Sequence, residues 1–221
     1  MGDTHPEPIR HLVVLGHPVA GSFNHSVAET YCQTVRECGQ AAELRDLYAI
    51  GFDPLLTASE WSGEAAFPPA VLAERELLSS AAIVTLVYPI WFGLPPAIVK
   101  GYVDRALGAG FDLRGLREGG AQPALADKRL MQFSSSATTL PWLEEQGQWV
   151  SLRQTFGRYL STVFGMKLAE HVHFDAVVHD LSARVVDEHL ERVRAATRQI
   201  CATMLSERHA AHGSLSGATQ S

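Results

Sequence analysis

The sequence predicts a three-layer α/β fold, in which helices cover both faces of a five-stranded parallel sheet with the order 2-1-3-4-5. Short apolar runs alternate with amphipathic helical patterns along the chain, as in sheets built from βαβ units. The 221 residues, of which 46% are hydrophobic and 19% charged, provide the core of one such domain and exclude a disordered chain.

Five short segments are predicted as strands, and some of them, such as His11–Leu15, are the continuous apolar runs typical of buried parallel strands. In chain order they are His11–Leu15, Glu43–Leu47, Ala81–Tyr88, Arg129–Ser134 and Lys167–Phe174. Among them, Ala81–Tyr88 (AAIVTLVY) carries the strongest strand signal.

Helical periodicity fills the intervals between these strands. In Asn24–Gly39 the apolar residues share one helical face, with Asn24 as the expected N-cap and Gly39 as the stop. The other expected helices are Pro69–Ser80, Pro95–Leu107, Leu143–Phe164 with a bend at Gly157, and Ser182–Leu205. Loops are expected at Tyr48–Pro69 and Gly108–Asp127. Residues 1–206 then form a single domain, and the small, polar residues 207–221 are expected to be a disordered tail.

Composition argues against several classes of protein. The net charge of −6 disfavours a general nucleic-acid binder, and no apolar run reaches the roughly 20 residues of a membrane span. The first ten residues carry no signal-peptide core. Three cysteines without paired spacing are typical of reduced thiols. We therefore expect a cytoplasmic protein that is not an integral membrane protein and does not bind nucleic acid.

In a sheet of this order, ligands bind beyond the carboxyl ends of the strands, at the switch point between the first and third strands. The first loop there, Gly16–Asn24 (GHPVAGSFN), ends at the start of a helix, where free N–H groups suit a phosphate. The loop contains neither Lys nor Arg, so neutral donors would hold the phosphate. A tight turn with an N-cap explains the same residues equally well.

Two further loops reach the same edge of the sheet. Tyr88–Ala97 (YPIWFGLPPA) is stiffened by three prolines, and its aromatic residues Trp91 and Phe92 suit a planar ligand such as isoalloxazine. The alternative is that these two rings fill the space between strand and helix. In Ser134–Thr139 (SSSATT), small residues let backbone N–H groups approach a ligand and stabilise negative charge on it.

Together these loops resemble those of the flavodoxin-like NAD(P)H:quinone oxidoreductases. The family pattern of a His followed by Ser-Phe-Asn is matched by His17 and residues 22–24. Its Pro-x-aromatic segment is matched by Pro89 and Trp91, and its Pro-Ala-(Ile/Leu)-x-Lys-Gly-(Trp/Tyr)-x-(Asp/Glu)-Arg motif by residues 96–105 (PAIVKGYVDR). Gly-Phe at 110–111, Asp-Leu-Tyr at 46–48 and Phe-Asp-Pro at 52–54 also match. The resemblance covers residues 9–180.

The resemblance implies a set of cofactor-binding residues in the three loops. They are His17, Ser22, Phe23 and Asn24 around the flavin phosphate and ribityl chain, Pro89, Ile90, Trp91 and Phe92 along the isoalloxazine, and Ser134, Ser135, Ser136 and Ala137 near its pyrimidine edge. Some members carry a Tyr and a His that assist hydride transfer, where this chain has Trp142 and Gln148. No catalytic residue is therefore assigned, and water or another residue is expected to deliver any proton.

The resemblance also implies the activity. A bound flavin, FMN as first choice and FAD as alternative, takes a hydride at N5 from NAD(P)H and passes two electrons to a quinone by a ping-pong mechanism. The active site lies between the subunits of a homodimer. The alternatives are a related reductase of azo or nitro compounds or free flavin, a flavin-bearing regulatory subunit of an ion-efflux system, and an electron-shuttle flavodoxin.

Several other residues lie outside these motifs. His171 and His173 have no third ligand at suitable spacing, so they are expected to be surface or active-site-rim histidines and no metal site is predicted. The pair Asp104-Arg105 is expected on a helix surface or at an interface. Trp142 and Trp149 fit either a lid over the flavin or the core.

Overall fold

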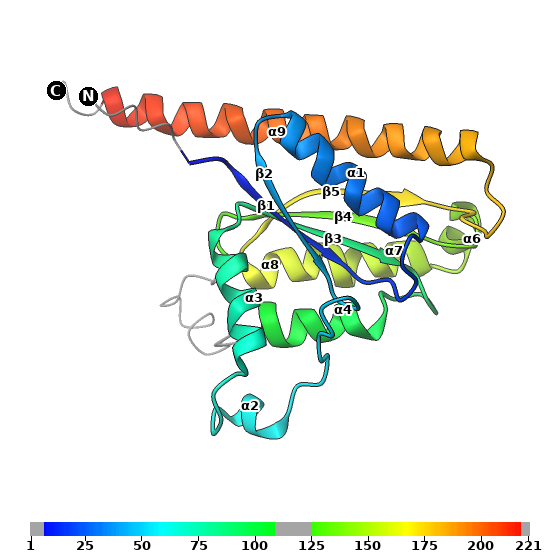
Figure 1. Cartoon of the computed structure of the whole chain (residues 1–221), viewed down its shortest axis with the longest axis horizontal. Helices are drawn as coiled ribbons and strands as arrows, with labels where there is room; N and C mark the ends of the chain where they lie inside the picture. The colour runs from blue at the N-terminus through cyan, green and yellow to red at the C-terminus, as the bar shows by residue number, and fades with distance from the viewer. Residues whose placement is uncertain (1–6, 109–124, 218–221) are drawn as a thin grey trace.

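The computed structural model describes residues 7–108 and 125–217 of the chain, and Figure 1 shows them as three layers. The five strands are β1 (Arg10–Leu15), β2 (Ala41–Asp46), β3 (Ile83–Pro89), β4 (Arg129–Ser135) and β5 (Lys167–Phe174). They form one parallel sheet in the order β2-β1-β3-β4-β5. The predicted fold class and strand order are confirmed. Most of the predicted loop Gly108–Asp127 lies outside the described residues.

Helices cover both faces of this sheet (Figure 1). One face carries α1 (Phe23–Glu37) and the long α9 (Ala183–Gly217). The other face carries α3 (Pro69–Ser80), α4 (Ala97–Tyr102), α7 (Gln148–Leu152) and α8 (Leu160–Phe164). Two π-helical turns, η1 (Val103–Leu107) and η2 (Arg153–Tyr159), continue α4 and join α7 to α8. The short helices α2 (Ala58–Ser62) and α6 (Leu140–Glu145) lie in connecting segments.

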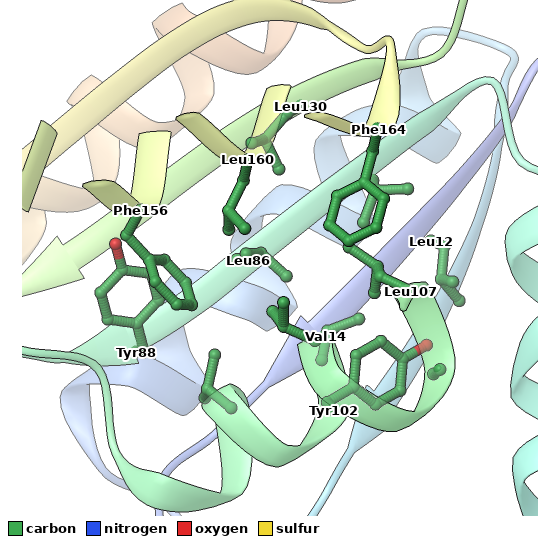
Figure 2. Close-up of a cluster of buried hydrophobic side chains, with 14 of the residues drawn as sticks. Leu12, Val14, Leu86, Tyr88, Tyr102, Leu107, Leu130, Phe156, Leu160 and Phe164 are labelled. Carbon is green, nitrogen blue, oxygen red and sulfur yellow. The ribbon is translucent and has the colours of Figure 1, made fainter. Parts of the chain in front are cut away.

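Strand β1 shows how the apolar runs build a core on each side of the sheet. Successive side chains of a strand point to opposite faces. Leu12 and Val14 accordingly pack in the cluster that includes α3, α4 and α8, and Figure 2 shows Val14 beside Leu86, its register partner in β3. Val13 and Leu15 pack in the second cluster, beneath α1 and α9. A strand buried on both faces has no polar alternation, which explains why HLVVL is continuously apolar.

A buried polar network joins β1 to both helices of one face. The Nε2 of His11 lies 2.8 Å from the side-chain oxygen of Gln40, which can only accept, so Nε2 carries the proton. The Nδ1 of His11 then accepts the hydroxyl proton of Tyr31 at 2.7 Å. Gln40 in turn donates to the backbone carbonyl of Cys201 in α9 at 2.9 Å. Every member is paired, and burial lowers the pKa of His11 from 6.5 to about 4.

Two helix ends differ from the prediction. The N-cap of α1 is Ser22 rather than Asn24, because the side chain of Asn24 is buried and bonded across the site described below. Helix α9 continues to Gly217, beyond the expected end at Leu205 and through most of the segment assigned to a tail. No proline interrupts it, and its extension is tied to the domain by the ion pair between Arg129 and Glu207 and by Arg208, which donates to the carbonyl of Glu7.

The predicted helix Leu143–Phe164 is divided. Gly147, at φ 69°, separates α6 from α7, because a left-handed residue cannot continue a helix. The bend expected at Gly157 coincides with the π-helical turn η2. The predicted loop Tyr48–Pro69 contains the short helix α2, which a capping box of Thr57 and Glu60 stabilises. Among the described helices, none has the length and apolarity that crossing a bilayer requires.

Arg105 is a buried structural residue rather than the surface residue expected from the sequence. Its guanidinium is 3% exposed and lies 2.6 Å from a carboxylate oxygen of Glu60. It also donates to the backbone carbonyl of Asp53. Gly101, one turn earlier, packs against Pro54 so closely that a Cβ there would lie 2.3 Å from the proline ring. The matched motif PAIVKGYVDR thus holds the segment around residues 53–60. Asp104, in contrast, pairs on the surface with Lys100 at 2.5 Å.

The His11 network predicts that the free energy of unfolding falls on mild acidification. The unfolded chain binds a proton at His11 near pH 6.5 but the folded chain only near pH 4, so protons favour unfolding as the pH falls through this window. The contribution at pH 5 is about 2 kcal/mol, from about 1.4 kcal/mol per pH unit. Urea unfolding at pH 7 and pH 5 measures it. In His11→Leu the difference between the two pH values should shrink by about that amount.

His209, on the exposed side of α9, provides the matched control. His209→Leu should keep the full pH-dependent difference of the parent chain. An equal difference in His11→Leu and in the parent chain would contradict the assignment of His11 as a neutral core histidine.

Candidate functional site

A cavity of about 530 Å³ lies at the carboxyl edge of the sheet, where β1, β3 and β4 end. All three predicted loops contribute to its wall. Of the predicted site residues, it is lined by His17, Ser22, Phe23, Asn24, Pro89, Ile90, Trp91, Ser135, Ser136 and Ala137. Ser134 and Phe92 do not line it. Figure 1 shows α1 and α9 both beginning at this edge, to the right of the view.

The first loop presents the start of α1 to the cavity. Ser22 is the N-cap, but its side chain makes no capping hydrogen bond to the helix. The first-turn N–H groups of Phe23, Asn24 and His25 therefore gain no partner from Ser22, and helix geometry gives them none. Phe23 anchors this turn, because its ring packs 5.3 Å from Phe174 and 5.7 Å from His189, between ring centroids. The arrangement can accept an anion with backbone donors and the positive end of the helix.

The second loop forms a tight turn that carries Trp91 to the cavity wall. Trp91 and Leu94 exchange two backbone hydrogen bonds of 2.9 and 3.0 Å. Between them Phe92 has φ 50° and Gly93 φ 82°, the signature of a type I′ turn. Positive φ is rare for a bulky residue, and the Phe92 ring is fully exposed at the tip of the turn. Phe92 thus points away from the cavity that the sequence assigned it to.

Gln148 packs against the same turn. A Cβ on Gly93 would lie 2.1 Å from the side-chain oxygen of Gln148, and the φ of 82° itself favours glycine there. Trp142, at the other position where some family members carry an acid, is half-exposed on α6. Neither residue lines the cavity. The expectation that these two positions supply no acid stays a prediction.

Hydrogen bonds pin the three loops to one another. The hydroxyl of Ser135 in β4 donates to the side-chain oxygen of Asn24 in α1 at 2.9 Å, and both groups are buried. The carbonyl of Ser135 accepts the N–H of Ile90 from the second loop at 2.6 Å. At the start of the first loop, a Cβ on Gly16 would lie 2.1 Å from Val99, so glycine lets α4 pack against the end of β1. The cavity is therefore preformed by packing and hydrogen bonding.

A row of hydrogen-bonded side chains supports the third loop from within the fold. Ser136 donates its hydroxyl proton to the carbonyl of Thr138, so it must accept from His173 Nε2 at 3.1 Å. His173 Nδ1 then accepts the proton of Ser134 at 2.9 Å, and Ser134 accepts from His171 Nε2 at 2.7 Å. Both histidines are neutral, because burial lowers the pKa of His173 to about 4 and that of His171 to about 3.

This row of side chains corrects the predictions for the two histidines and for Ser134. The sequence predicted surface or active-site-rim positions for His171 and His173; they lie within the fold behind the third loop, and the Trp149 ring packs 4.8 and 4.9 Å from theirs. Trp149 is therefore a core residue. Ser134 faces these histidines and positions the loop without reaching the cavity. Within the described ranges, no group of three or more His, Cys, Asp or Glu side chains forms a metal-binding cluster.

One wall of the cavity was not predicted from the sequence. It consists of the segment after β5 and the first turn of α9, which contribute Val177, Val178, His179, Leu181 and Val186. The topology offered a signal, because the loop after β5 must lie at the same sheet edge as the loop after β4. The segment is joined to the third loop by the N–H groups of Ala176 and Val177, which donate to the carbonyls of Thr138 and Ser136 at 3.0 and 2.8 Å.

The cavity lining among the described residues contains no Lys, Arg, Asp or Glu, and its ionisable groups are His17 and His179. Partial burial is the largest cause of the lowered pKa of His17. The His17 ring lies 6.1 Å from the Trp91 ring, centroid to centroid, and so links the first loop to the second. The cavity offers anion donors at one end and aromatic and apolar surface beside them. These residues fit the phosphate and ring of a flavin.

Comparisons with known proteins agree with this geometry. Residues 9–197 match the model of a family described by its flavodoxin-like fold. An uncharacterised NAD(P)H oxidoreductase from Haemophilus influenzae is 31% identical over 170 residues, which cover 76% of this chain and 82% of that protein.

Solved structures show the same architecture. An NAD(P)H:quinone oxidoreductase from Methanothermobacter marburgensis superposes with a TM-score of 0.75 at 25% identity, covering 87% of this chain and 97% of that one. An FMN-dependent NADH-azoreductase from Bacillus anthracis, solved with FMN, superposes with a TM-score of 0.64 at 16% identity, covering 87% and 99%. With the family match and the Haemophilus relative, these findings show that the chain belongs to the flavodoxin-like family of NAD(P)H:quinone oxidoreductases.

Proposed function

We propose that this protein is a flavin-dependent NAD(P)H:quinone oxidoreductase with FMN as its cofactor. The observation that carries the proposal is the preformed cavity at the switch point of the sheet, which places the start of α1 and the Trp91 turn on one wall. When bound, the flavin supplies two-electron transfer from NAD(P)H to a quinone, in two half-reactions that share the site. FAD is the alternative cofactor.

Each loop has a distinct task in this proposal. The first-turn N–H groups of α1 hold the phosphate, and Trp91 with Ile90 provides the apolar wall for the ring. Ser135, Ser136 and Ala137 form the small-residue wall, where backbone donors stabilise negative charge. His17 lines the cavity, and its lowered pKa favours the neutral ring. Water therefore remains our proposed proton source.

We further propose that the protein acts as a homodimer. A second, largely apolar cavity of about 540 Å³ lies between α2, η1 and η2, beside the Trp91–Leu94 turn. Its lining includes Trp61, Leu94 and Tyr159, which are 79%, 58% and 64% exposed. Apolar surface of this kind favours a partner. A second copy seated there would also cover the exposed Phe92 ring and the neighbouring flavin cavity.

The acceptor and the compartment belong to the same proposal. Azo and nitro compounds, free flavin and a regulatory role beside an ion-efflux system are the alternatives to quinone reduction. We place the protein in the cytoplasm, where its thiols Cys32, Cys38 and Cys201, all unpaired, would remain reduced.

The activity itself is the first test of the proposed function. The purified protein should be yellow, and the mass of the flavin released on denaturation should be that of FMN. Oxidation of NADH or NADPH should depend on an added benzoquinone or naphthoquinone, with parallel double-reciprocal plots, because one site serves both substrates in turn. Turnover with an azo dye but not with quinones would favour the azoreductase alternative. A flavin-bearing protein without turnover would favour the regulatory one.

The Trp91 wall gives a second prediction. Trp91→Ala should weaken FMN binding about tenfold, because aromatic packing and buried ring area together contribute about 1.4 kcal/mol. Fluorescence titration of the apoprotein with FMN measures the change. Trp142→Ala removes a comparably exposed indole outside the cavity and should leave the affinity unchanged. Equal affinities for the two variants would remove Trp91 from the binding site.

Sedimentation tests the homodimer. The parent chain should sediment at twice its mass of 24.1 kDa, and Tyr159→Glu should shift it toward the monomer by burying a charge in the proposed interface. Leu72→Glu, on the exposed surface of α3 outside this cavity, is the matched control and should leave the dimer intact. A monomeric parent chain with full activity would contradict the proposal.

A further inference from the structure

Behind the first loop, three side chains form a hydrogen-bonded array that the proposed function does not yet use. The hydroxyl oxygen of Ser22 lies 2.8 Å from Nδ1 of His25, and Nε2 of His25 lies 3.1 Å from a carboxylate oxygen of Asp46. Ser22 lines the cavity, His25 is 8% exposed and lies one layer behind it, and Asp46 ends β2. The array therefore runs from the cavity wall toward the surface.

The protons of this array are fixed by its partners. The other carboxylate oxygen of Asp46 accepts the backbone N–H groups of Tyr48 and Ala49 at 3.1 and 3.2 Å. A carboxylate in this setting is an acceptor, so His25 Nε2 carries a proton and donates it. In a neutral ring, Nδ1 then has only a lone pair, and it accepts the hydroxyl proton of Ser22.

In this neutral array the Ser22 hydroxyl cannot donate to an anion that the first-turn N–H groups of α1 bind. The Ser22 proton points back to His25, so the hydroxyl presents only lone pairs to the helix N-terminus. A phosphate dianion also has only acceptor oxygens. A contact between a phosphate oxygen and the Ser22 hydroxyl oxygen would therefore be repulsive, because neither atom supplies a proton. Among the residues that the structure describes, no Lys or Arg lines the cavity to offset the anion's charge. One added proton on His25 Nδ1 removes both difficulties.

We propose that the Ser22–His25–Asp46 array is a proton-coupled anion clamp, in which phosphate binding is accompanied by protonation of His25. This inference rests on the proposed function. One proton moves from solvent to Nδ1, and no bond between heavy atoms changes. His25 then donates to Ser22, the Ser22 proton turns to the phosphate, and the imidazolium stays paired with Asp46. The clamp supplies the cation that the first loop lacks in sequence.

The groups around His25 support a single proton. His17 faces it from the first loop with ring centroids 6.2 Å apart, and Asp46 faces it from the end of β2. Burial, and in smaller part the nearby His25, lowers the pKa of His17. His17 therefore does not compete for the proton, and Asp46 lies in position to pair with the protonated ring of His25. The free energy of FMN binding should then become less favourable as the pH rises, by up to about tenfold in affinity per pH unit.

Calorimetry of the apoprotein measures the proton directly. FMN and riboflavin are titrated at pH 7.5 in two buffers that differ in their enthalpy of ionisation. A phosphate monoester is largely dianionic at this pH, because its second pKa is about 6. Binding of FMN should take up about one proton, the stoichiometry of one histidine. Riboflavin, which has the ring but no phosphate, should take up none.

Variants assign the proton to His25. His25→Gln should abolish proton uptake and weaken FMN binding, while riboflavin binding stays as in the parent chain. Asp46→Asn keeps the oxygen that caps the turn but removes the charge, and it should reduce the uptake. His209→Gln removes a histidine on the exposed side of α9 and should retain the full uptake. FMN binding without uptake, or uptake that persists in His25→Gln, would overturn the proposal.

A probe without the flavin ring separates this inference from the proposed function. Inorganic phosphate is added to the isotope-labelled apoprotein, and the ring carbon and nitrogen shifts of His25 report its protonation. If FMN fails to bind but phosphate protonates His25, the proposed function is wrong and the clamp stands. If FMN binds and His25 stays neutral with either ligand, the clamp is wrong and the flavin site stands. If neither ligand has an effect, both are wrong.

Discussion

The hydrogen bond from Ser135 to Asn24 is the contact on which the cavity depends. It joins the end of β4 to the start of α1 across the end of β3, over residues far apart in the chain. The carbonyl of Ser135 also holds Ile90, so one residue fixes the relative positions of all three loops. Both Ser135 and Asn24 are buried, where an unpaired polar group is costly. The loops consequently have one arrangement, set by the ends of the parallel strands.

Sequence patterning predicted the layers well because the three central strands, β1, β3 and β4, are buried on both faces. Continuous apolar runs such as Ile83–Val87 have few alternatives in a parallel sheet. Patterning predicted the helix ends less well. The end of α9 depends on tertiary contacts of Glu207 with Arg129 and of Arg208 with Glu7, and no local signal contains them.

The partners of the polar residues in the site were harder to predict from the sequence than the positions of the loops. His171 and His173 alternate on β5 as surface residues would, yet both bond to Ser134 beneath the third loop. Arg105 similarly belongs to a residue type that is usually exposed, and its burial depends on its pairing with Glu60 in the short helix α2. Such pairings follow from three-dimensional register, which spacing along one strand or helix does not encode. The family motifs located the loops but did not reveal the partners that support them.

The contact between Arg208 and Glu7 joins residues 201 positions apart in the chain. Helix α9 begins at the cavity edge and runs roughly 50 Å, from its 35 residues at about 1.5 Å each, past the start of β1. The segments around Glu7 and Arg208 therefore lie in contact, at the end of the sheet opposite the cavity. A circular permutation that links these two segments and places new termini elsewhere would leave the three loops intact. The order of the elements along the chain is thus separable from the geometry of the site.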